Sequence, residues 1–464
     1  MKTLLLVLTT LFAIIAQSEQ TFTIPDINIQ AIDPKGLMVS IPDSPGIQLF
    51  AFHGNVNQPI KGKEDGTINK QILTAQDGVW SFTDPTIQLK AGDIVYYWIF
   101  VQHQRLGFDK QEQQFSVTKL VPPGTTTTDP TPPCKTTVTK INGDKPTCAN
   151  KLLFEDNFDR NAIDESKWLK EQYIVYSPDY EMVTYQKRPE NCYLESKNLV
   201  LKATLRPNPE DSLVDLTDGC TSQNCSANVI STIPAPIIAG RVKSKFRFKY
   251  GKIEIRAQLP RGDWIFPELY LEPHSDTYGP HYASGRMWLA YARGNLDLVT
   301  ANNEQIGNSV LYGGPVLGIK EPVRTQAAIK VVGQQPWGAG YHTYTLTWTP
   351  DQIEFQVDGE NKGTVRPPAG AFASIQTNEG YSYASEWKTK MAPFDHEFSL
   401  ILGIGVGGVS DFPDNSRSRG ILKPWKNFGS KQNLLFSKKS SQWEPTWEGD
   451  NSALKIEYVR VWAL

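Results

Sequence analysis

One segment divides the chain into two parts that have to fold separately. Residues 121–133 read VPPGTTTTDPTPP, a run of Pro and Thr with almost no side chain that could enter a core. This composition favours an extended linker, which is also open to O-glycosylation. We therefore predict a linker over 121–150, between a first domain at 19–120 and a second at 151–464. A chain of 464 residues leaves both domains long enough to bury a core.

Both parts carry the pattern of β-strands. In the first part, apolar runs such as 37–41 and 94–101 alternate with turn signals such as Asp33-Pro34-Lys35-Gly36. This spacing is typical of an immunoglobulin-like β-sandwich. The clearest strands of the second part are predicted at 246–259, 344–357, 398–406 and 454–462. Few helices are expected there, which favours a large two-sheet sandwich or jelly roll. The chain is therefore predicted to be all-β.

The amino terminus has the features of a secretory signal peptide at residues 1–18. Lys2 is followed by the apolar run 4–15 and then by Ala16-Gln17-Ser18, with small residues where signal peptidase needs them. The apolar run is too short to span a bilayer, and no later run of about 18 apolar residues exists. We expect a secreted, extracellular chain without a membrane span.

The five cysteines fit an oxidising compartment. Two short-range pairs are predicted to form disulfides, namely Cys134–Cys148 and Cys220–Cys225. Cys192 is left over, either as a buried thiol, which is the commoner state, or as a handle for an intermolecular bond. The one glycosylation sequon, Asn224-Cys225-Ser226, overlaps the second pair. A bridged Cys225 tightens the acceptor loop, so both occupied and unoccupied states of Asn224 are open.

The charge balance argues against several classes of partner. The chain has 47 Lys and Arg against 49 Asp and Glu, which gives a formal net charge of −2. Neither nucleic acid nor an anionic membrane surface is therefore predicted as the main partner. The six histidines show no metal-ligand spacing. We predict no cofactor and no metal site from these residues, and a structural Ca²⁺ of the kind found in such sandwiches stays open.

The stretch 284–295 reads Ser-Gly-Arg-Met-Trp-Leu-Ala-Tyr-Ala-Arg-Gly-Asn. It resembles the active-site strand of laminarinase-type β-1,3-glucanases, Ser-Gly-Glu-x-Asp-x-x-Glu-x-Arg-Gly-Asn. Arg286, Trp288 and Tyr291 stand where the three acids should be. On a strand with one bulge these positions share a face, and a retaining glycosidase needs two carboxyl groups there, about 5–5.5 Å apart. We therefore predict no catalytic residue and no hydrolysis.

The resemblance extends to most of the chain. In the second part it rests on Phe154–Phe158, Arg188–Asn191, Tyr250–Arg256, Leu259–Trp264, Tyr341–Trp348 and Ile456–Trp462. In the first part it rests on Ile41–Asp43, Phe50–Gly54, Gly78–Trp80 and Tyr97-Trp98. With the signal and the linker, the chain resembles the insect β-1,3-glucan recognition proteins, also called Gram-negative bacteria-binding proteins. The resemblance implies a glucan-binding module and a concanavalin-like jelly roll without catalytic acids. It also implies β-1,3-glucan as ligand, serine-protease cascade components as partners, and the haemolymph as location.

The resemblance also nominates sugar contacts. Trp98 corresponds to a strand Trp that contacts glucan in the family, although its apolar run equally fits a core position. Asp109 stands where the family usually has an Arg, and no Asp lies near Gln71 to match another family contact. Trp80 is a further candidate contact, with a core position favoured. Trp264 lies in a loop that the family places on the wall of the cleft.

The sequence is also compatible with other functions. Glu268 and Glu272 lie four residues apart on a predicted strand and could form a relocated catalytic pair, which would make the chain an active glucanase. Alternatively, both sugar sites have decayed and the chain is an adaptor plasma protein. The group Arg286, Trp288 and Tyr291 could form a recognition surface, because these residue types dominate binding hot spots, or could plug an unused cleft.

Overall fold

The computed structural model describes residue 22, residues 24–44, 46–76, 78–122, 135–207, 213–228 and 233–375, residue 387, and residues 389–464. The chain divides into two compact units, Met1–Thr131 and Pro132–Leu464. This division falls inside the predicted linker. The predicted signal peptide at 1–18 and Cys134 lie outside the described residues.

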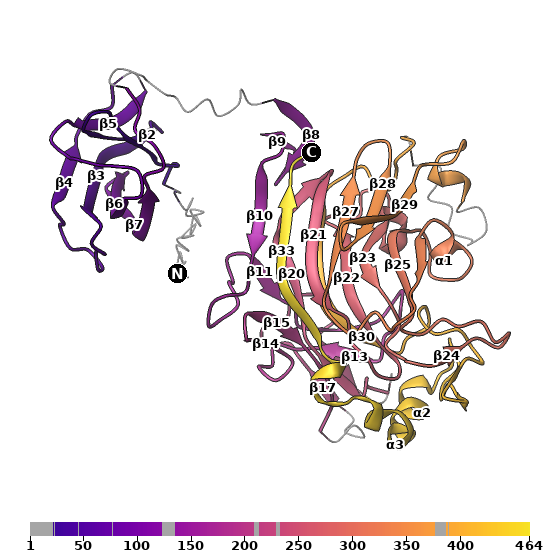
Figure 1. Cartoon of the computed structure of the whole chain (residues 1–464). Coiled ribbons are helices and arrows are strands. Elements are labelled where there is room, and N and C mark those ends of the chain that lie inside the picture. Colours follow the sequence, from indigo (N-terminus) through magenta and orange to yellow (C-terminus); the bar gives the residue numbers. More distant parts are fainter. Residues whose placement is uncertain are drawn as a thin grey trace, which may run out of the picture. The chain divides into compact units, whose positions relative to one another are not determined.

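The first unit is a β-sandwich of two antiparallel sheets (Figure 1). The three-stranded sheet has the order β1 (Asn28–Ala31), β2 (Leu37–Pro42) and β5 (Val79–Asp84). The four-stranded sheet has the order β4 (Ile68–Ile72), β3 (Ile47–Val56), β6 (Ile94–His103) and β7 (Leu106–Ser116). Alternate residues of β6, namely Val95, Tyr97, Ile99 and Val101, enter the core between the sheets. The immunoglobulin-like character of this sandwich stays a prediction.

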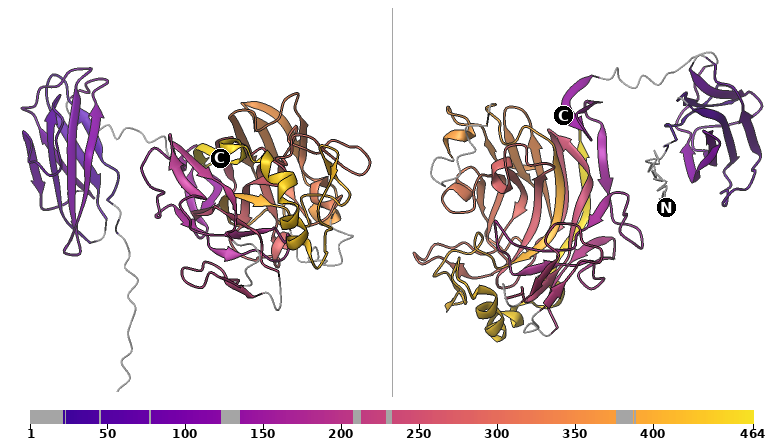
Figure 2. Two further views of the ribbon diagram at one scale, coloured as in Figure 1. Left: turned by 90° about the horizontal axis from the view of Figure 1, so that it is seen from below. Right: turned by 180° about the vertical axis from the view of Figure 1, so that it is seen from behind.

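The second unit has two large antiparallel sheets, whose layers can be followed in Figures 1 and 2. The first has the order β14 (Cys192–Glu195), β15 (Asn198–Leu201), β33 (Leu454–Trp462), β21 (Gly251–Gln258), β27 (His342–Trp348), β28 (Ile353–Val357) and β29 (Glu360–Val365), and β10 (Leu152–Asp156) also pairs with β33. The second has the order β26 (Ile329–Val332), β25 (Val310–Val316), β23 (Arg286–Tyr291), β22 (Ile265–Pro273), β30 (Phe398–Val406), β20 (Arg241–Lys249), β8 (Thr136–Ile141) and β9 (Lys145–Cys148), with β11 (Trp168–Lys170) also on β20. The predicted jelly-roll class agrees with this two-sheet arrangement.

Two hydrophobic clusters line the two faces of the nine-stranded sheet. One lies between the large sheets and holds residues of both, such as Ile255 and Leu400. The other lies on the opposite face and holds Tyr270, Trp288 and Ile401. A four-stranded sheet covers part of this opposite face, in the order β12 (Tyr173–Ile174), β13 (Val183–Tyr185), β19 (Ile237–Ala239) and β16 (Ala203–Leu205). One face of the nine-stranded sheet thus packs against the other large sheet. A cleft on this sheet can open only on the opposite face, which the four-stranded sheet covers in part.

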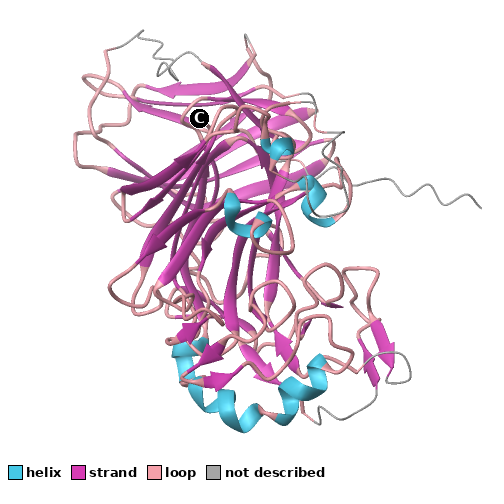
Figure 3. Cartoon of the chain, turned by 90° about the vertical axis from the view of Figure 1, so that its right-hand side faces the viewer, coloured by secondary structure: helices cyan, strands magenta, loops and turns pink. Residues whose placement is uncertain are grey.

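Smaller elements complete the second unit. Short strands pair as β17 (Leu213–Asp215) with β18 (Ser226–Asn228), and as β24 (Leu298–Val299), β31 (Arg417–Ser418) and β32 (Ile421–Leu422). The α-helices are α1 (Val323–Gln326), α2 (Gln432–Lys438) and α3 (Ser440–Trp443). Figure 3 shows α2 and α3 at one end of the strands. Among the residues that the structure describes, no helix is long and apolar enough to cross a membrane.

The predicted linker extends too far. Residues Thr136–Ile141 and Lys145–Cys148 form a hairpin, and its first strand pairs with β20 through Phe248 and Lys249. The hairpin therefore belongs to the second unit, and the linker is shorter than 121–150. The β-branched run Thr136-Thr137-Val138-Thr139 favours a strand, and its pairing with a distant sheet edge outweighs the polar composition.

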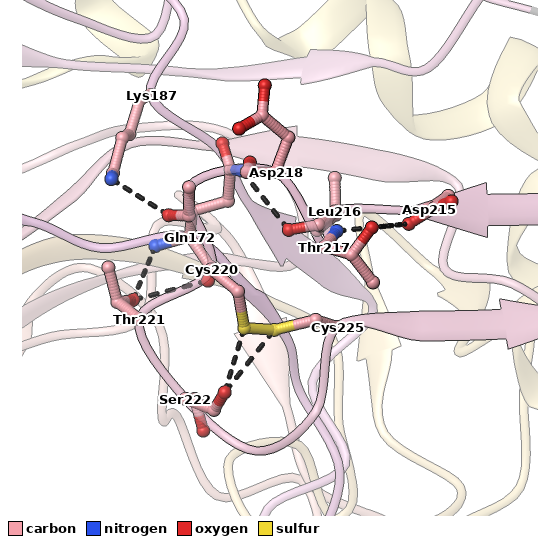
Figure 4. The surroundings of a disulfide bond; sticks show 11 residues. Gln172, Lys187, Asp215, Leu216, Thr217, Asp218, Cys220, Thr221, Ser222 and Cys225 are labelled. Atoms are coloured by element: carbon pink, nitrogen blue, oxygen red, sulfur yellow. Dashed lines mark hydrogen bonds between the residues drawn. A yellow bond between two sulfur atoms is a disulfide. The ribbon is translucent and has the colours of Figure 1, made fainter. Parts of the chain in front are cut away.

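The cysteines agree with the prediction where they are described. Cys220 and Cys225 form a disulfide, drawn in Figure 4. Cys148 is also disulfide-bonded, while its predicted partner Cys134 lies outside the described residues. Cys192 is a buried free thiol, and burial raises its pKa to about 12. A thiol in that state is inert, so the intermolecular role is not supported.

Candidate functional site

The strand with the substituted acid positions lies inside the nine-stranded sheet. β23 pairs with β22 on one side and with β25 on the other. The register against β25 shifts between Trp288 and Tyr291, so the predicted bulge is present. Leu289 faces the core between the large sheets, whereas Trp288 and Tyr291 belong to the cluster on the opposite face. The bulge thus brings Arg286, Trp288 and Tyr291 onto one face, as a catalytic trio would need.

Aromatic rings fill the space on that face. The rings of Trp288 and Tyr291 stack with centroids 4.5 Å apart and planes 12° apart. Their exposed fractions are 2% and 1%. The guanidinium carbon of Arg324 lies 5.3 Å from the centroid of the Trp288 ring. These two former acid positions are therefore closed to a polysaccharide, which favours the plug over the recognition surface.

Arg286 is the one of the three that keeps contact with solvent, with 16% of its side chain exposed. Its Nη1 donates to Asp179 Oδ2 over 3.2 Å and to the Tyr282 hydroxyl over 2.9 Å. The guanidinium also lies over the rings of Tyr270 and Tyr282, 4.4 and 4.7 Å from their centroids. Such cation–π contacts stabilise a partly desolvated cation. Arg286 is therefore held by a carboxylate, a hydroxyl and two aromatic rings, while part of its side chain stays exposed.

A network of ion pairs continues from Arg286 into the interior. Arg324 donates from Nη2 to Asp411 Oδ1 over 2.8 Å and from Nη1 to the Tyr282 hydroxyl over 2.7 Å. Asp179 lies 3.5 Å from Arg324 and so serves both guanidinium groups. Although burial opposes ionisation, Arg286 and Arg324 lower the pKa of Asp179. Asp179 and Asp411 thus neutralise arginines. Glu181, also buried there, accepts from the Tyr185 hydroxyl over 2.9 Å, and burial raises its pKa.

Glu268 and Glu272, the candidate relocated catalytic pair, also form ion pairs with basic side chains. Arg241 contacts Glu268 over 3.4 Å, Glu272 over 3.1 Å and Glu171 over 2.6 Å, and Lys243 contacts Glu272 over 2.8 Å. Burial raises the pKa of Glu268. Burial also acts to raise that of Glu272, but Lys243 and Arg241 lower it to about 2. Glu268 is 1% exposed, so it cannot reach a glycosidic bond, and the geometry opposes the glucanase interpretation.

Trp264 does not lie on an open cleft wall, which corrects the prediction. It is 2% exposed and packs edge-on against Phe412 and Trp425, with centroids 5.3 and 5.2 Å away. Its backbone has a φ of 65° and donates its N–H to Asn295 Oδ1 over 3.0 Å. Both aromatic partners come from distant loops, so the sequence near Trp264 could not reveal its burial.

In the first unit, two of the candidate contacts, Trp98 and Asp109, lie on the outer face of the four-stranded sheet, which we call the module face. Cross-strand pairing places two rows of residues there: Gln71, Ala51, Phe100 and Asp109 in one, and Asn69, His53 and Trp98 in the next. Tyr96 continues the face along β6. Half-exposed aromatic rings thus lie among amides and a carboxylate. Trp98 and Asp109 thus stand in neighbouring rows of the module face.

A loop at 57–66, which we call the strap, covers Trp98. The Trp98 Nε1 donates to the Glu64 carbonyl over 2.6 Å, and its ring stacks on His53 with centroids 4.1 Å apart. Lys63 extends from the strap to Asp109, with Nζ 2.8 Å from Oδ1. Trp98 is consequently 7% exposed, although it belongs to no core cluster. The tryptophan faces outward and is sheltered.

The strap is seated closely at its end. Gly66 has a φ of +70°, and a Cβ there would lie 2.5 Å from the Gly54 carbonyl oxygen. The next residue, Thr67, donates its N–H to Asn55 Oδ1 over 2.8 Å. Only glycine fits this conformation and this close approach without strain. The strap position is therefore specified by the sequence.

Trp80 is corrected from a candidate contact to a core residue. It lies on β5, in the other sheet, 4% exposed within the core of the sandwich. Its Nε1 donates to Asp43 Oδ1 over 2.6 Å. The rings with accessible surface on the module face are those of Tyr96 and Phe100, which are half-buried. Their strand alternation with Trp98 was the signal that could identify them.

Comparisons with known proteins match both units. The CBM39 family model, a carbohydrate binding domain (family 32), matches residues 23–138, and glycosyl hydrolases family 16 matches residues 320–397. A laminarinase of solved structure from Rhodothermus marinus is 21% identical, covering 68% of this chain and 97% of its own, with a TM-score of 0.44. The two family matches define a carbohydrate-binding module joined to a glycoside-hydrolase-like domain.

Two relatives match along nearly the whole chain. The Beta-1,3-glucan-binding protein of Tenebrio molitor is 36% identical over 98% of both chains. Gram-negative bacteria-binding protein 3 of Drosophila melanogaster is 34% identical over 96% of this chain and 95% of its own. The chain belongs to the family of β-1,3-glucan-binding and Gram-negative bacteria-binding proteins. These relatives are named as binding proteins and not as glucanases.

If the aromatic stack is a plug, its removal must cost stability. We expect Trp288→Ala to lower the free energy of unfolding of the second unit by about 3–5 kcal/mol, because a large buried ring leaves a cavity. Denaturant unfolding followed by fluorescence measures this. Leu296→Ala, at a residue 55% exposed, is the control with little expected effect. A loss below about 1 kcal/mol for Trp288→Ala would contradict the plug.

The ion pairs of Glu272 predict a specific response to acid. Its folded pKa of about 2 lies below the ordinary 4.5, so its stabilisation is complete above pH 4.5 and is lost as the pH falls toward 2. Glu272→Gln should therefore be less stable than the unmodified chain at pH 6, on the order of 1–3 kcal/mol. This difference in the free energy of unfolding should disappear near pH 2–3. A gap that is independent of pH would show that the carboxylate charge is not what stabilises this site.

Proposed function

We propose that this is a secreted pattern-recognition protein that binds microbial β-1,3-glucan without hydrolysing it. The observation that carries the proposal is the module face, where the half-exposed rings of Tyr96 and Phe100 lie among polar side chains. The flat faces of glucosyl rings stack on aromatic rings, and their hydroxyls need hydrogen-bonding partners beside them. Asp109 and Gln71 supply such groups in the same row as Phe100.

The domain assignment follows from this. The module at 19–120 is the part that binds glucan, and its family match and its relatives' names support that role. The glycoside-hydrolase-like domain contributes no catalytic residue, because Arg286, Trp288 and Tyr291 occupy the acid positions and are held by their neighbours. Membership of the family supports two further parts of the proposal: secretion into the haemolymph, and activation of serine-protease cascades of the prophenoloxidase or Toll type.

The alternative function as an adaptor protein is supported by a specific observation. The strap shelters Trp98, and Lys63 forms an ion pair with Asp109. Both contacts are expected if the glucan site has decayed and the chain acts as an adaptor. Because Trp98 is sheltered, Trp98→Ala would destabilise the module whether or not the ring meets sugar. Phe100 is therefore the better residue on which to separate glucan binding from decay.

We expect Phe100→Ala to weaken binding of the full chain to insoluble curdlan by about 1–2 kcal/mol, the size of an aromatic contact at a binding site. Pull-down at graded curdlan concentrations measures this. The matched control is Leu106→Ala, which removes an apolar side chain 64% exposed on the neighbouring strand. If the unmodified chain does not sediment with curdlan, the adaptor interpretation is correct. If both variants bind like the unmodified chain, Phe100 is not a contact.

The absence of catalysis is tested separately. Incubation of the purified chain with laminarin should release no reducing sugar above a buffer control, because the three acid positions hold no carboxylate and Arg241 pairs with both Glu268 and Glu272. The decisive control is Glu268→Gln. Activity that disappears in this variant would establish a relocated catalytic acid and overturn the proposal, whereas activity that persists would identify a contaminating glucanase.

A further inference from the structure

A pocket of about 450 Å³ remains open beside Arg286 in the second unit. Its lining includes Tyr270, residues 175–179 and residues 274–276. This volume lies in the range of small-molecule sites, about 300–1,000 Å³. The glucan proposal leaves this pocket without an occupant.

Most charges around the pocket are paired or neutralised within the protein. Burial raises the pKa of Glu181, which accepts a hydrogen bond from the Tyr185 hydroxyl, and Asp276 is left as an exposed carboxylate of the lining. Arg286 is bound to Asp179 over 3.2 Å, and Lys243 is bound to Glu272 over 2.8 Å. A charged ligand would have to break such pairs, which costs free energy. What remains for a ligand are hydroxyls, amides and the rings of residues such as Tyr176. These groups suit a neutral ligand rich in hydroxyls, such as a sugar.

The rim of the pocket carries the glycosylation sequon. Thr221, Ser222 and Asn224 line the pocket, and the Cys220–Cys225 disulfide ties their loop (Figure 4). The Ile174 N–H donates to the Asn224 carbonyl over 2.7 Å, and the Thr221 N–H donates to the Gln172 carbonyl over 3.0 Å. The loop is thus fixed beside the pocket wall. The side chains of Asn224 and Ser226 are both exposed, as a transferase requires.

We propose that Asn224 carries an N-linked glycan whose first sugar residues lie in this pocket. The co-reactant is a polyprenyl-diphosphate-linked oligosaccharide. The Asn224 amide nitrogen attacks C1 of its terminal N-acetylglucosamine, the C1–N bond forms as the C1–O bond to diphosphate breaks, and the nitrogen loses one proton. The proposal does not depend on glucan binding by the module.

The tether explains why the sugar stays in the pocket. A ligand attached at the rim has an effective concentration far above that of free sugars, so weak hydrogen bonds and one ring contact suffice. Because the attachment loop is already fixed, little conformational entropy is lost when the first sugars settle. The glycan then covers the pocket beside Arg286.

The test uses the full chain secreted from cultured mammalian cells. Peptide mass mapping should find a glycan on Asn224, and both Asn224→Gln and Ser226→Ala should abolish it. Cleavage by peptide:N-glycosidase should be at least about tenfold slower in the native chain than in the denatured chain. As a matched control, Glu304→Thr makes Asn302 a sequon on an exposed turn of the same unit, and that glycan should be removed rapidly from the native chain.

A second measurement separates occupancy of the pocket from a tight loop. Amide hydrogen exchange at residues 274–276, which line the same pocket as Asn224, should be faster in Ser226→Ala than in the glycosylated chain. An unmodified Asn224 overturns the proposal. So does a glycan whose loss leaves exchange at 274–276 unchanged, because such a glycan would extend into solvent.

Discussion

The pairing of buried guanidinium groups is the constraint on which the second unit depends. Arg241, Arg286 and Arg324 all lie on one face of the nine-stranded sheet, where an isolated charge would cost several kcal/mol. Each has a carboxylate within 3.5 Å, and Asp179 serves two of them. A carboxylate fixed to an arginine has no freedom to attack an anomeric carbon. The ion pairs therefore satisfy the buried charges of this face, and the same ion pairs keep these carboxylates from acting as nucleophiles.

Sequence reasoning succeeded where the determinant was local. The bulge between Trp288 and Tyr291 follows from the spacing of the substituted positions. The alternation along 94–101 puts Trp98 on the same side of its strand as Tyr96 and Phe100, but it does not decide which side faces outward. The Cys220–Cys225 bridge follows from short separation. These features depend on neighbours along the chain, so one sequence suffices to predict them.

Sequence reasoning failed where a distant segment decides. Trp98 is sheltered by the strap, whose contacts with it are fixed only in the folded module. Trp264 is buried by Phe412 and Trp425, and the hairpin inside the predicted linker is stabilised by pairing with β20. Glu268 and Glu272 share a face as predicted, but Arg241 determines that they form ion pairs.

The central claim is that glucan binds on the module face of the first unit. It does not bind on the face of the nine-stranded sheet that carries Trp288 and Tyr291. Hydrogen–deuterium exchange of the full chain with and without soluble laminarin tests it directly. The account predicts slower exchange in the strap and in β6 and β7, with β22 and β23 unchanged. Slower exchange confined to β22 and β23 would contradict it, because the ligand would then occupy the former catalytic cleft.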